Sequence, residues 1–259
     1  MKSKATYATY DSDWSAKGYL AQYYSGLDQL SVDELAILRF IQHFLSQNHN
    51  FFPEMLEVGC GPTIHHSLPF EEYVGQICMA DYKKSNLEEI QKWVEGSPDA
   101  HNWGPFLAQV LTTENGQEPT TKELVSRMDS LKAKIVQFAE CNILRFLPLG
   151  YAKEFDLVTS FYTVECSTRT KDEWRLAMEN LSGLVKSGGW VVLSALRQTD
   201  HYMVGDTRFH CAPIDENDMR MTLIDLGFIM STITIEVNQC PEWAEEGFNS
   251  VIIASAQKL

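Results

Sequence analysis

The chain has 259 residues, of which 44% are hydrophobic and 11% aromatic, which is enough apolar material for one sizeable core. This composition excludes a disordered, collagen-like or miniature protein. Twenty-one Lys and Arg against 35 Asp and Glu give a formal charge of −14, and such a field repels phosphate backbones and anionic lipid surfaces. We therefore expect neither a nucleic acid nor a membrane as partner, and a small neutral or cationic ligand suits the field better.

Six cysteines are scattered along the chain without a CxxC pair: Cys60, Cys78, Cys141, Cys166, Cys211 and Cys240. This scatter is typical of buried thiols in a reducing compartment. No run approaches the roughly 18 apolar residues that span a bilayer, and the stretch 1–14 lacks the apolar segment of a secretion signal. These features predict a cytoplasmic protein.

The first strong helix signal is the run Ser31-Val32-Asp33-Glu34, which has the form of a capping box. An apolar stripe with helical spacing follows it, at Leu35, Leu38, Ile41 and Leu45. We expect a helix here that leads into the first strand.

Short apolar runs then alternate with helical patterns. The strand-like runs are 55–58, 76–80, 135–139, 155–161 and 190–196. The helical patterns between them are 86–94, 121–132, and a stretch that Thr170 and Glu173 cap and that ends at 187–189. Such alternation predicts a parallel sheet with helices on both faces.

The C-terminal part departs from this alternation. A helix is expected over 215–226, and Gly227-Phe228 ends it. Two strand-like runs follow, 229–237 and 250–256, without a helix between them, so we expect an antiparallel pair. No repeat or low-complexity linker interrupts the chain, and one domain over 1–259 is the simplest organisation.

A glycine-containing turn follows the first predicted strand. It reads Gly59-Cys60-Gly61-Pro62-Thr63, and its glycines allow a tight turn and close approach of a ligand to the backbone. The spacing departs from GxGxxG and a proline follows the second glycine, which disfavours a dinucleotide pyrophosphate site. A purely structural strand-to-helix turn is the alternative.

Asp81 ends the second strand-like run, about 20 residues after the turn, as in nucleoside-binding sheets. A carboxylate there can accept hydrogen bonds from both hydroxyls of a ribose. The alternative is that Asp81 caps the helix that follows. Because both positions face the crevice at the carboxyl ends of the strands, we favour a nucleoside-bearing cofactor.

At this point the sequence resembles the family that contains nicotinamide, phenylethanolamine and indolethylamine N-methyltransferases and thioether S-methyltransferase, which use S-adenosylmethionine. Two motifs carry the resemblance most clearly, YLAQYY at 19–24 and GCGPTI at 59–64. Asp81 with Asn86, EIQKW at 89–93, NWGP at 102–105 and YMVG at 202–205 are also similar.

The resemblance implies an α/β fold with a Rossmann-like, seven-stranded, mostly parallel sheet and one antiparallel C-terminal strand. Helices would cover both faces, and residues 1–50 would form an N-terminal helical cap over the site. It also implies S-adenosyl-L-methionine as cofactor and S-adenosyl-L-homocysteine as product. The residues that would bind the cofactor are Tyr10, Tyr19, Tyr24, Gly59, Cys60, Gly61, Thr63, Asp81, Tyr82, Asn86, Asn142, Ile143 and Phe161.

Within that set the resemblance implies separate roles. Asp81 and Asn86 would hold the ribose, and Asn142 with Ile143 the adenine. Tyr24 would approach the methionine end, and Tyr19 would close over the acceptor.

For the methyl acceptor, the resemblance implies Tyr19 and Glu165 as catalytic residues. A carboxylate such as that of Glu165 can hold an ammonium through charge-assisted hydrogen bonds, although a capping or loop role is the alternative. Ser194, Tyr202 and Glu245 would complete the acceptor site, and Glu245 could instead be a solvated loop residue. Ser194 replaces the aspartate of the nicotinamide enzyme, which argues against nicotinamide as acceptor.

The chain also departs from the family pattern. Asn142 stands where an aspartate is usual, Cys60 replaces a common serine, and His65-His66 replaces a Tyr-Gln pair. No third ligand at an ordered spacing accompanies the histidines, so we expect a solvent-facing or helix-start pair and no metal.

Together these features predict in-line transfer of a methyl group to the nitrogen of a small amine or N-heterocycle. Transfer to sulfur or another chalcogen is the alternative, because the site needs no obligatory base. A noncatalytic cofactor-binding protein of the same fold is the third possibility. With no heptad or exposed apolar strip, we expect a monomer.

Overall fold

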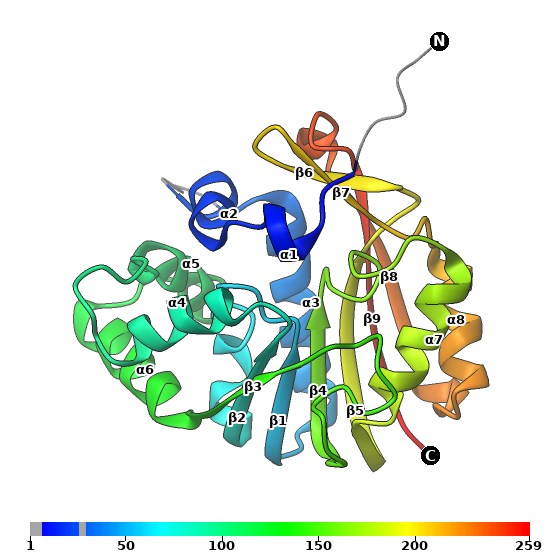
Figure 1. The fold of residues 1–259 in the computed structure, drawn as a ribbon. Helices are drawn as coiled ribbons and strands as arrows, with labels where there is room; N and C mark the ends of the chain where they lie inside the picture. The colour runs from blue at the N-terminus through cyan, green and yellow to red at the C-terminus, as the bar shows by residue number, and fades with distance from the viewer. Residues whose placement is uncertain (1–6, 26–29) are drawn as a thin grey trace.

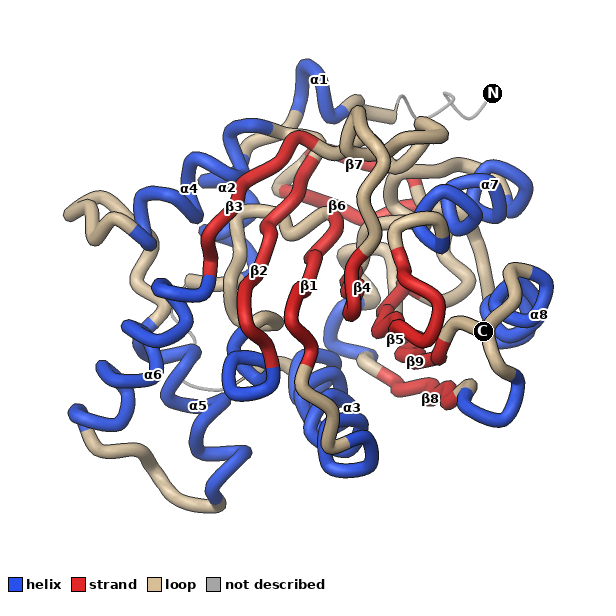
Figure 2. The backbone as a smooth tube through the Cα atoms, turned by 90° about the horizontal axis from the view of Figure 1, so that it is seen from below, coloured by secondary structure: helices blue, strands red, loops and turns tan. Residues whose placement is uncertain are grey.

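The computed structural model describes residues 7–25 and 30–259. The first six residues, which are part of the stretch considered above for a secretion signal, lie outside the described residues. Within the described ranges, seven strands form one sheet in the order β3-β2-β1-β4-β5-β9-β8 (Figures 1 and 2). Its strands are β1 (Phe52–Val58), β2 (Val74–Asp81), β3 (Ile135–Glu140), β4 (Phe155–Phe161), β5 (Val185–Leu196), β8 (Thr234–Gln239) and β9 (Ser250–Gln257).

The sheet is parallel except at β9. The strands β1 to β5 pair in parallel, whereas β9 runs antiparallel to both β5 and β8. This arrangement confirms the predicted Rossmann-like sheet with one antiparallel C-terminal strand. All five predicted strand runs before the C-terminal pair lie within observed strands.

Successive side chains of a strand point to opposite faces of the sheet. The side chains on both faces are apolar, and helices bury both faces. Met55 of β1 joins one core cluster and its neighbour Leu56 joins the other. The first cluster includes apolar residues of α3 (Val32–Asn48), α4 (Lys84–Val94), α5 (Gly104–Asn115) and α6 (Thr121–Lys134). The second includes those of α7 (Lys171–Ser182) and α8 (Glu216–Asp225), and Figure 2 shows α3 and α7 on opposite sides of the sheet.

A small layer lies across the carboxyl ends of the strands. It contains α1 (Tyr10–Asp13), α2 (Ala16–Tyr23) and the antiparallel hairpin of β6 (His201–Val204) and β7 (Thr207–His210). The chain before α1 is bonded to this hairpin, since the Ala8 amide donates to the Arg208 carbonyl over 2.8 Å. Figure 1 shows this layer above the sheet. Of the cap expected over residues 1–50, α1 and α2 lie in this layer, whereas α3 packs against the sheet.

Several local predictions need correction. Ser31 precedes α3 as predicted, but its side chain makes no capping hydrogen bond, and the Glu34 carboxylate contacts other side chains instead. The predicted capping box is therefore wrong, because the buried Glu34 carboxylate bonds Tyr24 and His66 instead of the amides at the helix start. The helix capped by Thr170 ends at Ser182, so 187–189 lies inside β5, and part of 229–237 is the 3₁₀ turn η2 (Met230–Thr232).

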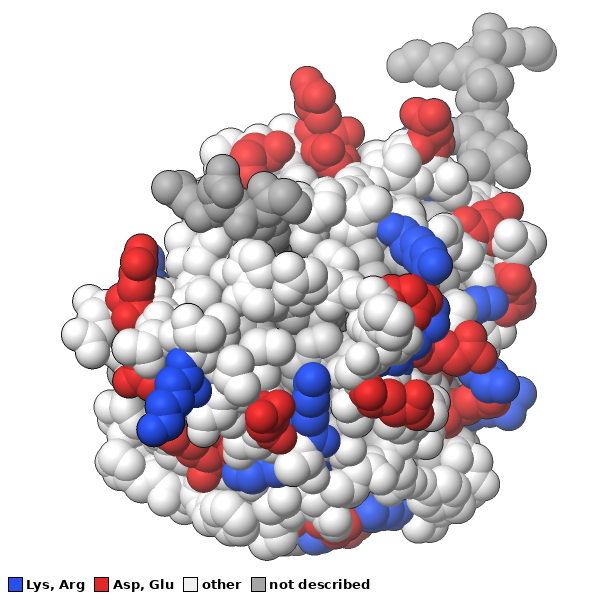
Figure 3. Space-filling model, turned by 90° about the vertical axis from the view of Figure 1, so that its left-hand side faces the viewer, with Lys and Arg blue, Asp and Glu red and all other residues white. Residues whose placement is uncertain are grey.

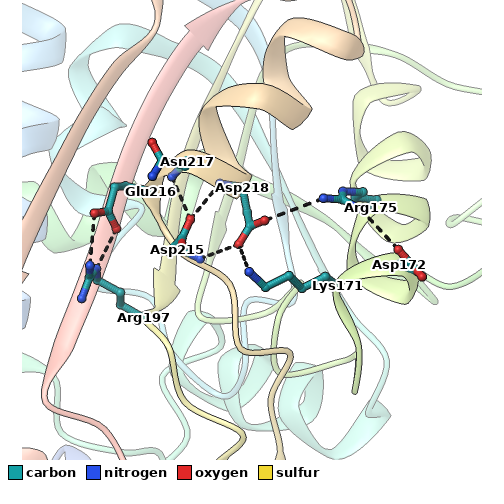
Figure 4. A network of polar contacts seen from close by, with 8 residues as sticks. All are labelled: Lys171, Asp172, Arg175, Arg197, Asp215, Glu216, Asn217 and Asp218. Atoms are coloured by element: carbon teal, nitrogen blue, oxygen red, sulfur yellow. Dashed lines mark hydrogen bonds and ion pairs between the residues drawn. The ribbon is translucent and has the colours of Figure 1, made fainter.

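The start of α8 is held by a network of charges (Figure 4). Asp215 and Asp218 form a capping box, and Lys171 of α7 contacts the Asp218 carboxylate. Arg197, just after β5, donates to both carboxylate oxygens of Glu216 over 2.7 and 3.1 Å. These contacts join α8 to α7 and to the end of β5.

The surface carries charges of both signs. Figure 3 shows acidic and basic side chains interspersed over the face drawn there, with acidic groups prominent at its upper edge. Among the described helices, none combines the length and apolar character that crossing a membrane requires.

Candidate functional site

A cavity of about 420 Å³ is lined by residues at the carboxyl ends of the parallel strands and by residues of the N-terminal layer. Its size is that of a small-molecule site. All thirteen residues that the resemblance implied for the cofactor line it: Tyr10, Tyr19, Tyr24, Gly59, Cys60, Gly61, Thr63, Asp81, Tyr82, Asn86, Asn142, Ile143 and Phe161. The fold thus brings together residues spread over about 150 positions of the chain.

The glycine turn forms one wall of the cavity. Gly59 and Gly61 both have a positive φ, 66° and 58°, which residues with a Cβ atom rarely adopt. A Cβ on Gly59 would lie 2.0 Å from Cγ2 of Thr163, whereas a Cβ on Gly61 would meet nothing within 4 Å. Gly59 is therefore required by packing, and Gly61 borders open space that a ligand can fill.

Asp81 connects this turn to the next segment. Its Oδ2 accepts the Gly61 amide over 2.8 Å, and its Oδ1 accepts the Lys83 amide over 2.7 Å and the Asn86 side chain over 2.9 Å. Lys83 is the N-cap residue of α4, so Asp81 supports the helix start as well as lining the cavity. Burial raises the Asp81 pKa, while the bonds from Lys83, Gly61 and Asn86 act in the opposite direction.

The cavity fits an adenosyl cofactor at this wall. The open space beside Gly61 gives room next to the backbone, and Oδ2 of Asp81, which accepts one hydrogen bond, keeps a lone pair for a hydroxyl donor. Asn142 also lines the cavity, and its Oδ1 accepts the Leu144 amide over 3.0 Å. Ile143 beside it is buried.

The N-terminal layer is tied to the same segment by side chains. Trp14 Nε1 donates to Asn86 Oδ1 over 2.7 Å, and the Tyr82 hydroxyl donates to Asp11 over 2.7 Å. The hydroxyls of Tyr10 and Tyr202 lie 2.8 Å apart, which joins α1 to the β6–β7 hairpin. These bonds close the cavity on the side opposite the sheet.

A second part of the cavity is enclosed by aromatic rings around one carboxylate. The ring centroids of Tyr19 and Tyr23 lie 5.0 Å apart, and those of Tyr23 and Trp243 lie 5.3 Å apart. Asp33 accepts the Tyr162 hydroxyl over 2.9 Å and the Trp243 indole N–H over 2.8 Å, and it is only 5% exposed. Burial, and next the charge of Glu34, raise the Asp33 pKa.

Sequence reasoning missed Asp33 and Trp243 as site residues. In the sequence, Asp33 fits a helix start, where acidic residues are common. One feature of the sequence could have indicated their burial: two adjacent carboxylates, Asp33 and Glu34, begin a helix whose following residues are strongly apolar. Nothing in the sequence connects that helix start with Trp243, which lies 210 positions later.

Three residues predicted for the acceptor do not line this cavity. Glu165 is fully buried behind Cys166 and Leu196, which do line it, and its Oε1 accepts the Leu196 amide over 2.9 Å. Burial raises the pKa of Glu165 to about 7. Ser194 is buried within β5, and Glu245 is exposed in the loop before β9.

The two adjacent histidines are not at the surface, so the expectation of a solvent-facing pair is wrong, whereas their position just before a helical turn agrees with a helix-start pair. His65 is 0% and His66 3% exposed, and both precede the 3₁₀ turn η1 (Leu68–Tyr73). Their Nε2 atoms lie 3.2 and 2.8 Å from Oε2 of Glu34. The third polar partner comes from α3, 31 residues upstream, which no local spacing of the histidines could reveal.

Comparison with known proteins identifies the family of the chain and agrees with the fold. The model of the NNMT/PNMT/TEMT family matches residues 2–259. Indolethylamine N-methyltransferase of Mus musculus is 29% identical over 224 residues, covering 84% of this chain and 83% of that protein. Nicotinamide N-methyltransferase of Homo sapiens is 25% identical over 230 residues, covering 85% and 84%.

Among solved structures, a magnesium protoporphyrin IX methyltransferase from Synechocystis with bound SAM has a TM-score of 0.55 at 13% identity, covering 95% of this chain and 92% of that one. This likeness confirms the fold of the sheet. The match of the family model over nearly the whole chain shows that the chain belongs to the NNMT/PNMT/TEMT family and is an S-adenosylmethionine-dependent small-molecule methyltransferase.

Proposed function

We propose that this enzyme methylates the nitrogen of a small amine that binds against Asp33. The main support for this proposal is that Asp81, in the proposed cofactor wall, and Asp33, in the aromatic enclosure, line the same cavity. The relatives named above act on indolethylamine and nicotinamide, both nitrogen compounds. The acceptor enclosure of this chain combines aromatic rings with a carboxylate, which is a favourable environment for an ammonium group.

S-adenosylmethionine, when bound, supplies a methyl group on a positively charged sulfur, so the protein mainly has to bind and orient the two reactants. We assign the ribose to Asp81 and Asn86 and the adenine to Asn142 and Ile143. In this proposal α1 and α2 act as a lid, and Tyr19 closes over the acceptor. The aromatic walls exclude water and add no competing charge.

Asp33 has two tasks in this proposal. An amine attacks only in its neutral form, while most alkylamines are protonated near neutral pH. The Asp33 carboxylate attracts the ammonium and accepts its proton at one of its oxygens, directly or through a water molecule. Tyr162 and Trp243 hold that carboxylate in place through the two hydrogen bonds described above.

The test is a screen of primary, secondary and tertiary amines and N-heterocycles, with methylated products detected by mass spectrometry. With the best acceptor, we expect D33N to lower kcat/KM about 10–100-fold, in line with the loss of a charged hydrogen bond. Binding of S-adenosylhomocysteine should stay within about twofold, because Asp33 lies outside the proposed nucleoside site. Unchanged turnover of an amine by D33N would contradict the assignment.

E165Q and E245Q are the matched comparisons. Each replaces one carboxyl group with an amide, behind the cavity wall in E165Q and in the exposed loop in E245Q. A larger loss in E165Q than in D33N would return the acceptor role to Glu165, as the family resemblance first implied.

A thioether or another chalcogen compound is the second candidate acceptor. Sulfur makes favourable contacts with aromatic rings, and Tyr19, Tyr23 and Trp243 offer them in this enclosure. The screen therefore includes thioethers and selenoethers. Methylation confined to these compounds would replace the amine proposal, and cofactor binding without any product would favour a noncatalytic role.

A further inference from the structure

Glu34, His65 and His66 form a compact buried cluster at the edge of the cavity. One carboxylate oxygen of Glu34 lies 3.2 Å from Nε2 of His65 and 2.8 Å from Nε2 of His66. The three potential ligand atoms all lie within 4.8 Å of one another. Ligands around a tetrahedral Zn²⁺ ion at about 2.0–2.2 Å are separated by roughly 3.3 Å, so small shifts bring these atoms to coordination distance.

The donor set suits a divalent transition metal. Two imidazoles and one carboxylate form the protein ligand set of several catalytic zinc sites, which leave the fourth position for water or substrate. The three groups carry one negative charge when both rings are neutral, and a divalent ion would compensate it.

The surroundings resemble those of buried metal sites. The Tyr24 hydroxyl donates to Oε1 of Glu34 over 3.2 Å and so orients the carboxylate from behind. Aromatic rings surround the imidazoles, with Phe161 stacked on His66 at 4.2 Å and Phe106 edge-on to His65 at 4.5 Å. Such an apolar shell strengthens the attraction between an ion and its ligands.

The cluster is also accessible from the cavity, because Glu34 and His66 both line it. An ion held there would therefore have one side toward the space in which a small molecule binds. We propose that Glu34, His65 and His66 form a three-ligand site for a divalent transition metal ion such as Zn²⁺, with its open coordination position directed into the cavity. This inference does not depend on the identity of the methyl acceptor.

The first test is titration of the full-length, chelator-treated protein with Co²⁺ and, separately, with Zn²⁺. We expect one equivalent to bind with a dissociation constant below about 1 μM, and bound Co²⁺ to show the strong visible absorption of a four-coordinate ion. No uptake of either metal by the folded protein would overturn the proposal. Thiolate-to-metal charge-transfer bands would place the ion on cysteines and would overturn it too.

Variants then identify the ligands. E34Q retains an oxygen that can accept hydrogen bonds but removes the charge, and H66A removes one imidazole. We expect each to weaken metal binding at least about 10–100-fold, the loss usual even for residues that only support metal ligands. H43A is the matched control, since His43 lies exposed on α3, the same helix as Glu34, and should bind metal as the wild type does.

Circular dichroism and thermal unfolding show whether each variant folds. If H66A does not fold, E34Q carries the test, because its side chain has nearly the same volume and can still bond to the rings. Unchanged metal affinity in a folded E34Q would show that the cluster is only a hydrogen-bonded one.

Discussion

Asp81 illustrates how one residue supports both the fold and the site. Its carboxylate holds the glycine turn, the start of α4 and the Asn86 side chain, and it lines the cavity. We expect D81N to weaken S-adenosylhomocysteine binding about 10–100-fold, because charged hydrogen bonds to hydroxyls contribute about 1.5–3 kcal/mol. Isothermal titration calorimetry measures this loss.

The control for that experiment is D225N, which removes one charge from an exposed position on α8. Its affinity should match that of the wild type. Equal affinities of D81N and wild type would show that Asp81 serves the fold alone.

Glu165 supports a prediction about stability and pH. Its folded-state pKa is raised from 4.5 to about 7, mainly by burial, so the folded chain binds this proton more tightly than the unfolded chain. The stability that this group contributes is therefore complete below the unfolded pKa and is lost as the pH rises through about 7. Between about pH 5 and 8.5, E165Q should gain roughly 2–3 kcal/mol in unfolding free energy relative to the wild type.

Urea unfolding at several pH values measures this difference. Other titrating groups, such as buried Glu57, whose pKa burial raises to about 7, are present in both proteins and cancel in the comparison. E245Q, which changes an exposed carboxylate, should show no such slope. A pH-independent difference between E165Q and the wild type would contradict a raised pKa for Glu165.

The sequence allowed some site residues to be predicted and not others. Asp81 was found because its position after a strand relates it to the glycine turn through the geometry of a parallel sheet. Asp33, Trp243 and the Glu34–histidine cluster were missed because each depends on contacts between segments that are distant in sequence. Those contacts arise only where α3 packs against the residues before η1 and against η3 (Pro241–Trp243).

At the scale of elements, the N-terminal layer acts on the site through a few side-chain bonds. Trp14 holds α1 and α2 to Asn86 of α4, which is itself bonded to Asp81. W14F keeps an aromatic ring but removes the indole N–H. We expect it to raise the dissociation rate of S-adenosylhomocysteine about 5–10-fold, because one buried hydrogen bond contributes about 1 kcal/mol.

Stopped-flow measurement of dissociation provides the value. Y151F is the control, since Tyr151 is an exposed aromatic residue that does not line the cavity. Identical rates for W14F and the wild type would show that these helices do not retain the ligand.

The elements themselves were mostly predictable, because alternating apolar and helical patterns report burial directly. The helix α5 was not predicted, since Gly104-Pro105 was treated only as part of a resemblance, although proline at a first helical position is favourable. The β6–β7 hairpin was also missed, because its strands have four residues each and little alternation to detect. Short elements that depend on contacts with the N-terminal layer leave a weak signal in sequence.

For the whole molecule, the net charge of −14 gives a prediction about salt. A negative field attracts a cationic acceptor, and salt screens that attraction over a distance of about 10 Å at 0.1 M. We expect kcat/KM for a cationic amine to fall severalfold between about 20 and 300 mM NaCl, and kcat/KM for a neutral heterocycle to stay nearly constant. Equal salt dependence for both would show that the charge plays no part in acceptor capture.

The placement of the cofactor between the glycine turn and Asp81 underlies all the other roles proposed for the site. A crystal structure of the complex with S-adenosylhomocysteine tests this placement directly. We expect a ribose hydroxyl within hydrogen-bond distance of Asp81 Oδ2, the adenine beside Ile143, and the sulfur facing the Asp33 enclosure. A nucleoside bound elsewhere, or one whose sulfur faces away from Asp33, would contradict it.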